Sequence, residues 1–180
     1  MDENMALKAF RKWFSSADER AQVGPLYAAI IAEARLPHWY VEGGVADSID
    51  GRFDMVNAVL ALVLIRMEAL GDEAQMPSTL LAETFVNDMD GQLRELGIGD
   101  IVVGKHIGRM MAALGGRLGA YRQGFGEGGN PQAALLRNLY RAEGPGAAAL
   151  GHVETALRAF AARIGRQSLA GLLAGQLDGA

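Results

Sequence analysis

The chain has 180 residues, of which 50 % are hydrophobic and 21 % are charged, and its formal net charge is -4. This composition is typical of a globular protein of one domain and excludes an intrinsically disordered chain. The acidic balance argues against direct DNA binding, because the summed field repels a phosphate backbone. The sequence contains no cysteine, which excludes disulfides, thiolate metal sites and cysteine nucleophiles.

Apolar residues recur at helical spacing through most of the chain, and no convincing alternating pattern of a strand is present. We therefore predict an all-α fold, a single compact bundle of about six to eight helices. An amphipathic first helix is expected over residues 4–16, and a second helix from Pro25 to about Arg35. The acidic, amphipathic start lacks the apolar run of a secretory leader, so we expect a cytoplasmic protein.

The middle of the chain combines one irregular stretch with two long helices. Residues 36–49 are predicted to form a connecting loop, because the helical period breaks at a Pro-His-Trp-Tyr run and a Gly-Gly pair. Asp50 is expected to cap a third helix with a buried body over residues 53–70. A fourth helix is predicted over residues 78–96.

A fifth helix is predicted from a cap at Asp100 to about Arg122. Small residues recur along one of its sides at spacings of three or four: Gly104, Gly108, Ala112, Gly115 and Gly119. An interior glycine costs a helix about 1 kcal/mol relative to alanine. We therefore expect another helix to pack closely against this stripe of small residues. Internal packing within the chain is favoured, and docking of a client or partner helix is the alternative.

The last third of the chain is predicted to hold helices over residues 131–140 and 147–164, followed by a leucine-containing tail that packs on the core. We divide the chain into an N-terminal amphipathic helix and linker, a main helical domain and a C-terminal tail. These parts cover residues 1–24, 25–165 and 166–180. The longest apolar run is far shorter than the roughly 20 residues that a membrane-spanning helix needs.

Acidic residues raise one alternative, a small helical metal-dependent enzyme. Its candidate ligands are Asp47, Asp50, Asp54, Asp88 and Glu95. Helix capping and ion pairs at helical spacing account for the same residues, and neither a nucleophile elbow nor a phosphate-binding glycine loop is visible. The three histidines, His38, His106 and His152, are far apart in the sequence. We therefore expect no catalytic residue, no metal and no cofactor.

Basic residues raise a second alternative, a ribosome-docking scaffold that binds no client. It would act through Lys8, Arg11 and Lys12, and through the basic side of the fifth helix. Salt-sensitive binding to the ribosome would favour this alternative.

Four stretches resemble a known family. DSIDGRFDMV at residues 47–56 is similar to a signature at the start of the central helix in ubiquinol-cytochrome c chaperones, and FVNDMDGQLRELGIGDIVVGKHIGRM at residues 85–110 is similar to a second signature. LYAAIIAEAR at residues 26–35 and RNLY at residues 137–140 extend the likeness over roughly residues 25–141. On these stretches the chain is identified as a member of that family, of the bacterial type.

The resemblance implies a non-catalytic assembly chaperone that binds newly made cytochrome b and assists biogenesis of the ubiquinol-cytochrome c reductase complex. It implies a protein peripheral to the inner membrane, at its cytoplasmic face. It also implies two further partners, the ribosome exit region and a small partner protein.

A hydrophobic helical client calls for an exposed apolar patch with a polar rim. We expect the apolar contact from three residues of the 36–47 segment: Trp39, Tyr40 and Val45. For Trp39, filling a gap in the core is the alternative. The rim is expected from Asp47, Arg52, Asp88, Arg94, Asp100, Lys105 and Arg117.

Overall fold

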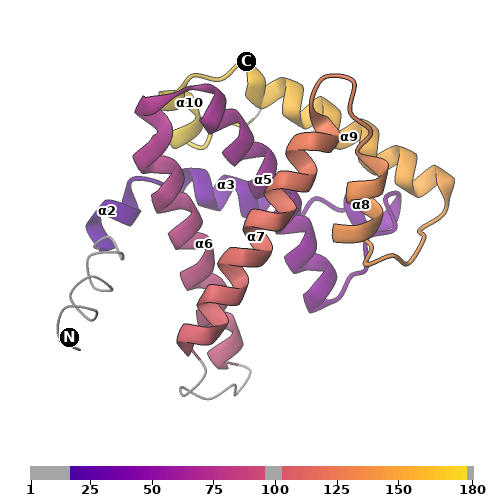
Figure 1. Cartoon of the computed structure of the whole chain (residues 1–180), viewed down its shortest axis with the longest axis horizontal. Coiled ribbons are helices and arrows are strands. Elements are labelled where there is room, and N and C mark those ends of the chain that lie inside the picture. The colour runs from indigo at the N-terminus through magenta and orange to yellow at the C-terminus, as the bar shows by residue number, and fades with distance from the viewer. Residues whose placement is uncertain (1–16, 96–102, 178–180) are drawn as a thin grey trace, which may run out of the picture.

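Helix α5 (Ile49–Ala69) lies at the centre of the molecule, with other helices around it (Figure 1). The structure, a computed structural model, describes residues 17–95 and 103–177, and the side chains of residues 19–91 and 112–177. Within these ranges every regular element is a helix, so the predicted all-α fold is confirmed. None of the described helices combines the length and the apolar character that crossing a membrane requires.

The remaining helices follow one another through short connections. They are α2 (Ala17–Ala21), α3 (Gly24–Ala34), α4 (His38–Val41), the 3-10 helix η1 (Asp72–Ala74), α6 (Gln75–Glu95), α7 (Val103–Phe125), α8 (Gln132–Asn138), α9 (Ala147–Gly165) and α10 (Leu169–Leu173). Helices α6 and α7 contact each other along an arm that reaches away from the other helices (Figure 1).

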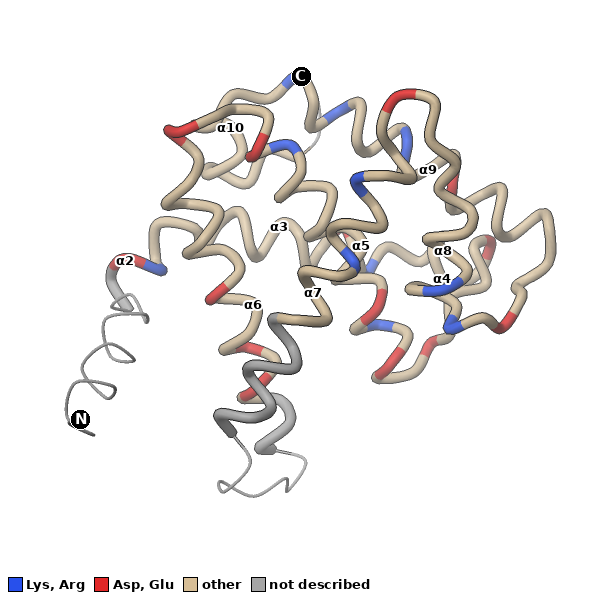
Figure 2. Tube along the Cα trace, in the orientation of Figure 1, with Lys and Arg blue, Asp and Glu red and all other residues tan. Residues whose placement is uncertain are grey.

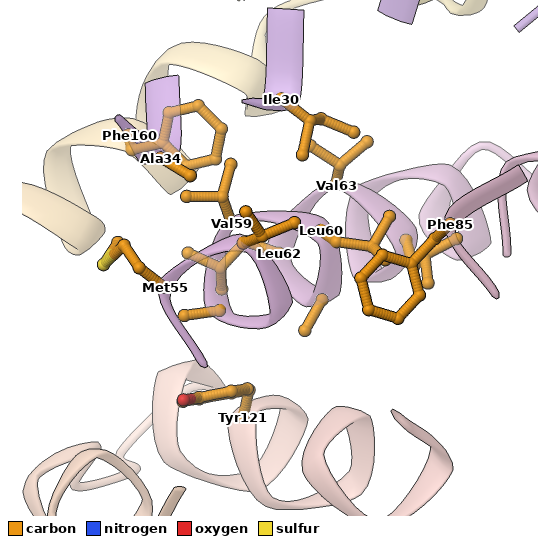
Figure 3. Close-up of a cluster of buried hydrophobic side chains, with 14 of the residues drawn as sticks. Ile30, Ala34, Met55, Val59, Leu60, Leu62, Val63, Phe85, Tyr121 and Phe160 are labelled. Carbon is orange, nitrogen blue, oxygen red and sulfur yellow. The ribbon is translucent and has the colours of Figure 1, made fainter. Parts of the chain in front are cut away.

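Helix α5 is buried because apolar residues surround it. Every residue from 54 to 64 is buried, a pattern typical of a helix enclosed in a core. Ile30 of α3 and Phe160 of α9 cover one side of α5, and Tyr121 of α7 covers the opposite side (Figure 3). The helix ends before Gly71, whose φ of 83° lies in the left-handed region that glycine adopts easily.

The cap of α5 differs from the prediction. Ser48, in extended conformation, accepts a hydrogen bond on its Oγ from the backbone N–H of Gly51 at 3.1 Å. Asp50 lies inside the first turn and forms an ion pair with Arg141. The predicted cap at Asp50 is therefore wrong, and Ser48 fills that role.

The 36–49 segment contains helix α4, where the sequence predicts only a loop. Trp39 anchors this short helix: its side chain is fully buried, and its indole Nε1–H donates to the carbonyl oxygen of Glu33 at 2.8 Å. The hydroxyl of Tyr140 donates to the carbonyl oxygen of Gly43 at 2.6 Å, just after α4. The segment is thus fixed to the bundle from both sides.

The stripe of small residues on α7 does not pack internally where its surroundings are described. A Cβ atom added at Gly115 or Gly119 would meet nothing within 4 Å, and Ala112 is exposed. The predicted internal packing is therefore wrong at these positions, and docking of a client or partner helix stays a prediction. Gly104 and Gly108 lie outside the described side chains.

The C-terminal tail packs on the core as predicted. Leu172 of α10 and Leu177 are buried, and α10 contacts α3. Gly175, with a φ of 77°, turns the chain against the backbone of Pro25. The tail therefore covers the start of the second predicted helix.

Candidate functional site

The first turn of α5 requires a residue without a side chain. A Cβ atom on Gly51 would collide with the carbonyl oxygen of Ala46, which lies directly beside it. The chain can therefore fold back before α5 only because glycine stands at this position. This fold brings Asp47 and Arg52 onto the same surface.

One turn further, Asp54 is buried between two arginines. Arg117 of α7 donates from Nη2 to Oδ1 of Asp54 at 2.6 Å, and Arg141 donates from Nε to Oδ2 at 2.6 Å. Only 1 % of the Asp54 side chain is exposed. Two guanidinium groups thus compensate the cost of burying the carboxylate. We call Asp54, Arg117 and Arg141 the Asp54 clasp.

The clasp accounts for a residue that the sequence places on the binding rim. The Arg117 guanidinium lies 5.4 Å from the centre of the Phe53 ring and is mostly covered. Arg117 therefore stabilises the contact between α5 and α7, and its role on the rim stays a prediction. The sequence analysis missed Arg141, although it directly follows the RNLY stretch.

Two of the three predicted apolar contacts are wrong in this conformation. Trp39 is fully buried and Val45 is 3 % exposed, so neither offers its side chain to a client. Both side chains pack into the hydrophobic core, where their apolar surface is removed from water. The alternative in which Trp39 fills the core is the correct one.

The other residues predicted here lie at the surface. Tyr40 is half-buried, and its hydroxyl donates to the carbonyl oxygen of Ala34 at 2.7 Å. Arg52 donates from Nε to Oδ1 of Asp47 at 2.6 Å, and this hydrogen bond holds the pKa of the Asp47 carboxyl below its usual range. Burial raises the pKa of Tyr40, while the nearby positive charge of Arg52 opposes that rise.

Three apolar side chains that the sequence analysis did not select are exposed in this part of the chain: Leu36, Val41 and Ile49. We call these three residues, together with Tyr40, Asp47 and Arg52, the α4–α5 corner. Both acidic and basic positions are present around α4 and the first turns of α5 (Figure 2). This part of the chain therefore combines exposed apolar side chains with charged ones, the mixture that is found at protein-binding surfaces. Their exposure could not be predicted from helical spacing, because the apolar residues of this segment do not follow a helical period.

The remaining predicted residues lie apart from the corner or outside the described side chains. Asp88 of α6 accepts a hydrogen bond on Oδ2 from the hydroxyl of Tyr27 at 2.7 Å, an interaction that ties α6 to α3. Burial, followed by this hydrogen bond, raises the pKa of Tyr27 far above its usual range. The side chains of Arg94, Asp100 and Lys105 are outside the described ranges.

The carboxylates of the enzyme alternative do not converge in the described side chains. No group of three or more His, Asp or Glu residues there could hold a metal ion. Asp50 and Asp54 bind Arg141, and Asp47 binds Arg52. Asp88 bonds to Tyr27 instead, and the side chain of Glu95 is not described.

Two histidines that are far apart in the sequence meet between α4 and α9. Nδ1 of His38 lies 3.1 Å from Nε2 of His152, and both side chains are half-buried. Burial, followed by the charge of His152, lowers the pKa of His38. This pair is next to the α4–α5 corner along the chain.

Comparisons with known proteins agree with this architecture. The model of the ubiquinol-cytochrome c chaperone family matches residues 41–178. The crystal structure of the Cbp3 homolog from Brucella abortus is similar, with a TM-score of 0.76, 29 % sequence identity and coverage of 97 % of this chain and 96 % of that chain. No curated protein matches significantly. Because the family model covers most of the chain, from α4 to the tail, the protein belongs to the ubiquinol-cytochrome c chaperone family.

Proposed function

We propose that the protein binds newly made cytochrome b and assists biogenesis of the ubiquinol-cytochrome c reductase complex. Membership in the ubiquinol-cytochrome c chaperone family carries this proposal. The similar Cbp3 homolog extends the likeness over nearly the whole chain. Cytochrome b is a hydrophobic helical client, so binding it requires an exposed apolar contact surface.

The α4–α5 corner is the surface that we propose for the client. Val41 and Ile49 are 77 % and 68 % exposed, although both are large apolar residues. The exposed ion pair between Asp47 and Arg52 lies in the same stretch of chain and contributes little to folding, as is usual for exposed pairs. These side chains are therefore free to serve binding with little cost to stability.

Deleting the gene tests the function itself. We expect the deletion strain to lose haem b of the reductase from its membranes, together with ubiquinol-cytochrome c reductase activity. Difference spectroscopy of membrane haem b and haem c, and an assay of the reductase, measure both effects. Normal spectra and normal activity in the deletion strain would show that the proposed function is wrong.

Complementation with variants tests the corner separately. We expect Val41→Ser with Ile49→Ser to capture at least about tenfold less cytochrome b in a pull-down, because about 1.4 kcal/mol of lost apolar contact is a factor of ten. Its thermal midpoint should stay near that of the natural protein, since exposed substitutions change stability little. Met76→Ser is the matched control, because Met76 is 67 % exposed and lies at the start of α6. Normal capture of cytochrome b by the double variant would exclude the corner as the client-binding surface without contradicting the proposed function.

The proposal includes a location at the cytoplasmic face of the inner membrane, where a membrane-protein client is inserted. Contacts with the ribosome exit region and with a small partner protein belong to the same proposal. The scaffold alternative depends on Lys8, Arg11 and Lys12, which lie outside the described residues. Salt-sensitive ribosome binding in a strain without cytochrome b would favour that alternative.

A further inference from the structure

The contact between His38 and His152 joins two helices that carry different parts of the structure. His38 belongs to α4, and His152 lies 114 residues later on α9. Their ring centroids are 5.3 Å apart, and the rings meet edge to face. Within the described side chains no third ligand completes a metal site around them. The short distance between the two nitrogens is therefore that of a hydrogen bond, in which one nitrogen donates and the other accepts.

This hydrogen bond survives the first protonation of the pair but not the second. The neutral pair carries two ring protons and the singly charged pair carries three. In both states one of the two facing nitrogens keeps a lone pair that accepts the bond. A second added proton removes that lone pair and leaves two positive charges on facing nitrogens. The charge of His152 therefore opposes protonation of His38, and the doubly charged pair is the unfavourable state.

The charges around His38 come from three helices. Arg163 of α9 adds positive charge, and Glu42 at the end of α4 adds negative charge. Arg163 also pairs at 3.4 Å with the buried Glu33 of α3. Burial and the charge of His152 outweigh Glu42, so the pKa of His38 is lowered. The neutral form of His38 is thus favoured in the folded protein.

Two other contacts of α4 do not titrate near neutral pH. Trp39 donates its indole N–H to the carbonyl oxygen of Glu33. The hydroxyl of Tyr140 donates to the carbonyl oxygen of Gly43, and burial raises the pKa of Tyr140 to about 12. The histidine pair differs from both because imidazole titrates between pH 5 and 8.

We propose that His38 and His152 form a proton-sensitive clasp that holds α4 against α9 and opens when the pair takes up its second proton. A histidine with a lowered native pKa contributes stability that is present above its ordinary pKa of about 6.5 and is lost as the pH falls below it. Opening releases the His38 end of α4, next to Tyr40 and Val41 of the α4–α5 corner, while the buried Trp39 and the hydrogen bond of Tyr140 still anchor the segment. Acidification therefore alters this corner before it unfolds the bundle.

Nuclear magnetic resonance of the full chain tests the clasp through two readouts. The first is the titration midpoint of His38, which we expect below about 6.5 in the natural protein and higher by about half a pH unit or more in His152→Gln. The second is the hydrogen exchange of the Gly43 amide, which donates to the carbonyl oxygen of His38 at 2.9 Å. Its protection, corrected for intrinsic exchange, should fall about fivefold or more as His38 titrates.

Glutamine at position 152 keeps hydrogen-bonding groups but takes up no proton, so His152→Gln should make the protection of Gly43 independent of pH. Thr155→Gln, at an exposed position of the same helix α9, is the control and should behave like the natural protein. If His152→Gln does not fold, the natural protein alone tests the proposal. The protection of the Gly43 amide should then fall with pH while the protection of amides within α9 does not. An unchanged His38 midpoint in His152→Gln, or constant protection of Gly43 from pH 8 to pH 5, would overturn the proposal.

Discussion

Two residues after α8 adopt a backbone conformation that side chains rarely favour. Arg141 and Ala142 have φ values of 52° and 67°, in the left-handed region. The backbone N–H of Ala142 donates to the carbonyl oxygen of Leu136 at 2.7 Å. Helices commonly end with a residue in the left-handed region, and that residue is usually glycine. This turn positions the Arg141 side chain toward Asp54, so local backbone strain supports the Asp54 clasp.

We expect Ala142→Gly to stabilise the protein by about 0.5–1 kcal/mol, because glycine adopts the left-handed region without the steric cost of a Cβ atom. Ala148→Gly is the matched control on the exposed face of α9, where the same change should lower the free energy of unfolding by about 0.5–1 kcal/mol. Urea unfolding of both variants measures these opposite signs. Loss of stability in Ala142→Gly would contradict the strain argument.

Single residues also show where reasoning from sequence stops. Ser48 and Asp50 are both good helix caps, and the choice between them depends on where the chain turns before α5. That turn is set by Gly51 packing against Ala46, a contact that no helical period encodes. The burial of Trp39 also depends on a tertiary contact. Its indole N–H can donate to the carbonyl oxygen of Glu33 only when α4 packs against the end of α3.

At the scale of elements, long helices are predictable because their apolar pattern is local. Helices α5 and α9 agree closely with the predicted ranges, as does α3. The short α4 has too few residues to show a period. The stripe of small residues on α7 misled the prediction, because spacing alone does not tell whether a neighbour or solvent faces it.

Open space beside α7 predicts that its glycines lower stability without any packing gain. We expect Gly115→Ala together with Gly119→Ala to raise the free energy of unfolding by about 1–2 kcal/mol, since alanine is the better helix former and each added Cβ meets no neighbour. Gly51→Ala is the control and should destabilise, because its Cβ has no room beside Ala46. Thermal unfolding measures the difference. A lower midpoint temperature for the double variant would show that another segment covers α7 in solution.

At the scale of the whole molecule, the Asp54 clasp connects three segments of the chain. Arg117 and Arg141 are 63 and 87 residues from Asp54 in the sequence, so local pattern could not predict either contact. The resemblance to the family located the DGRFD stretch, but only the structure shows that its second aspartate bonds to both arginines. This carboxylate therefore acts on folding, while the exposed neighbours Asp47 and Arg52 remain available for binding.

Removing the buried carboxylate should destabilise the whole bundle. We expect Asp54→Ala to cost about 3 kcal/mol, because it leaves the mostly covered Arg117 guanidinium without its partner. Arg141→Ala should cost less, since Arg141 is half exposed and Asp54 keeps its bond to Arg117. Arg122→Ala, which breaks an exposed pair with Glu68, is the control and should change stability by less than about 1 kcal/mol.

The double variant distinguishes a connected clasp from independent contacts. Once Asp54 is replaced, Arg141 has lost its buried partner and retains only the exposed Asp50, so adding Arg141→Ala should cost almost nothing more. Denaturant unfolding of the two single variants and the double variant measures this coupling. If the two losses simply add, Arg141 does not act through Asp54, and its contribution must come from its other contacts, such as the ion pair with Asp50.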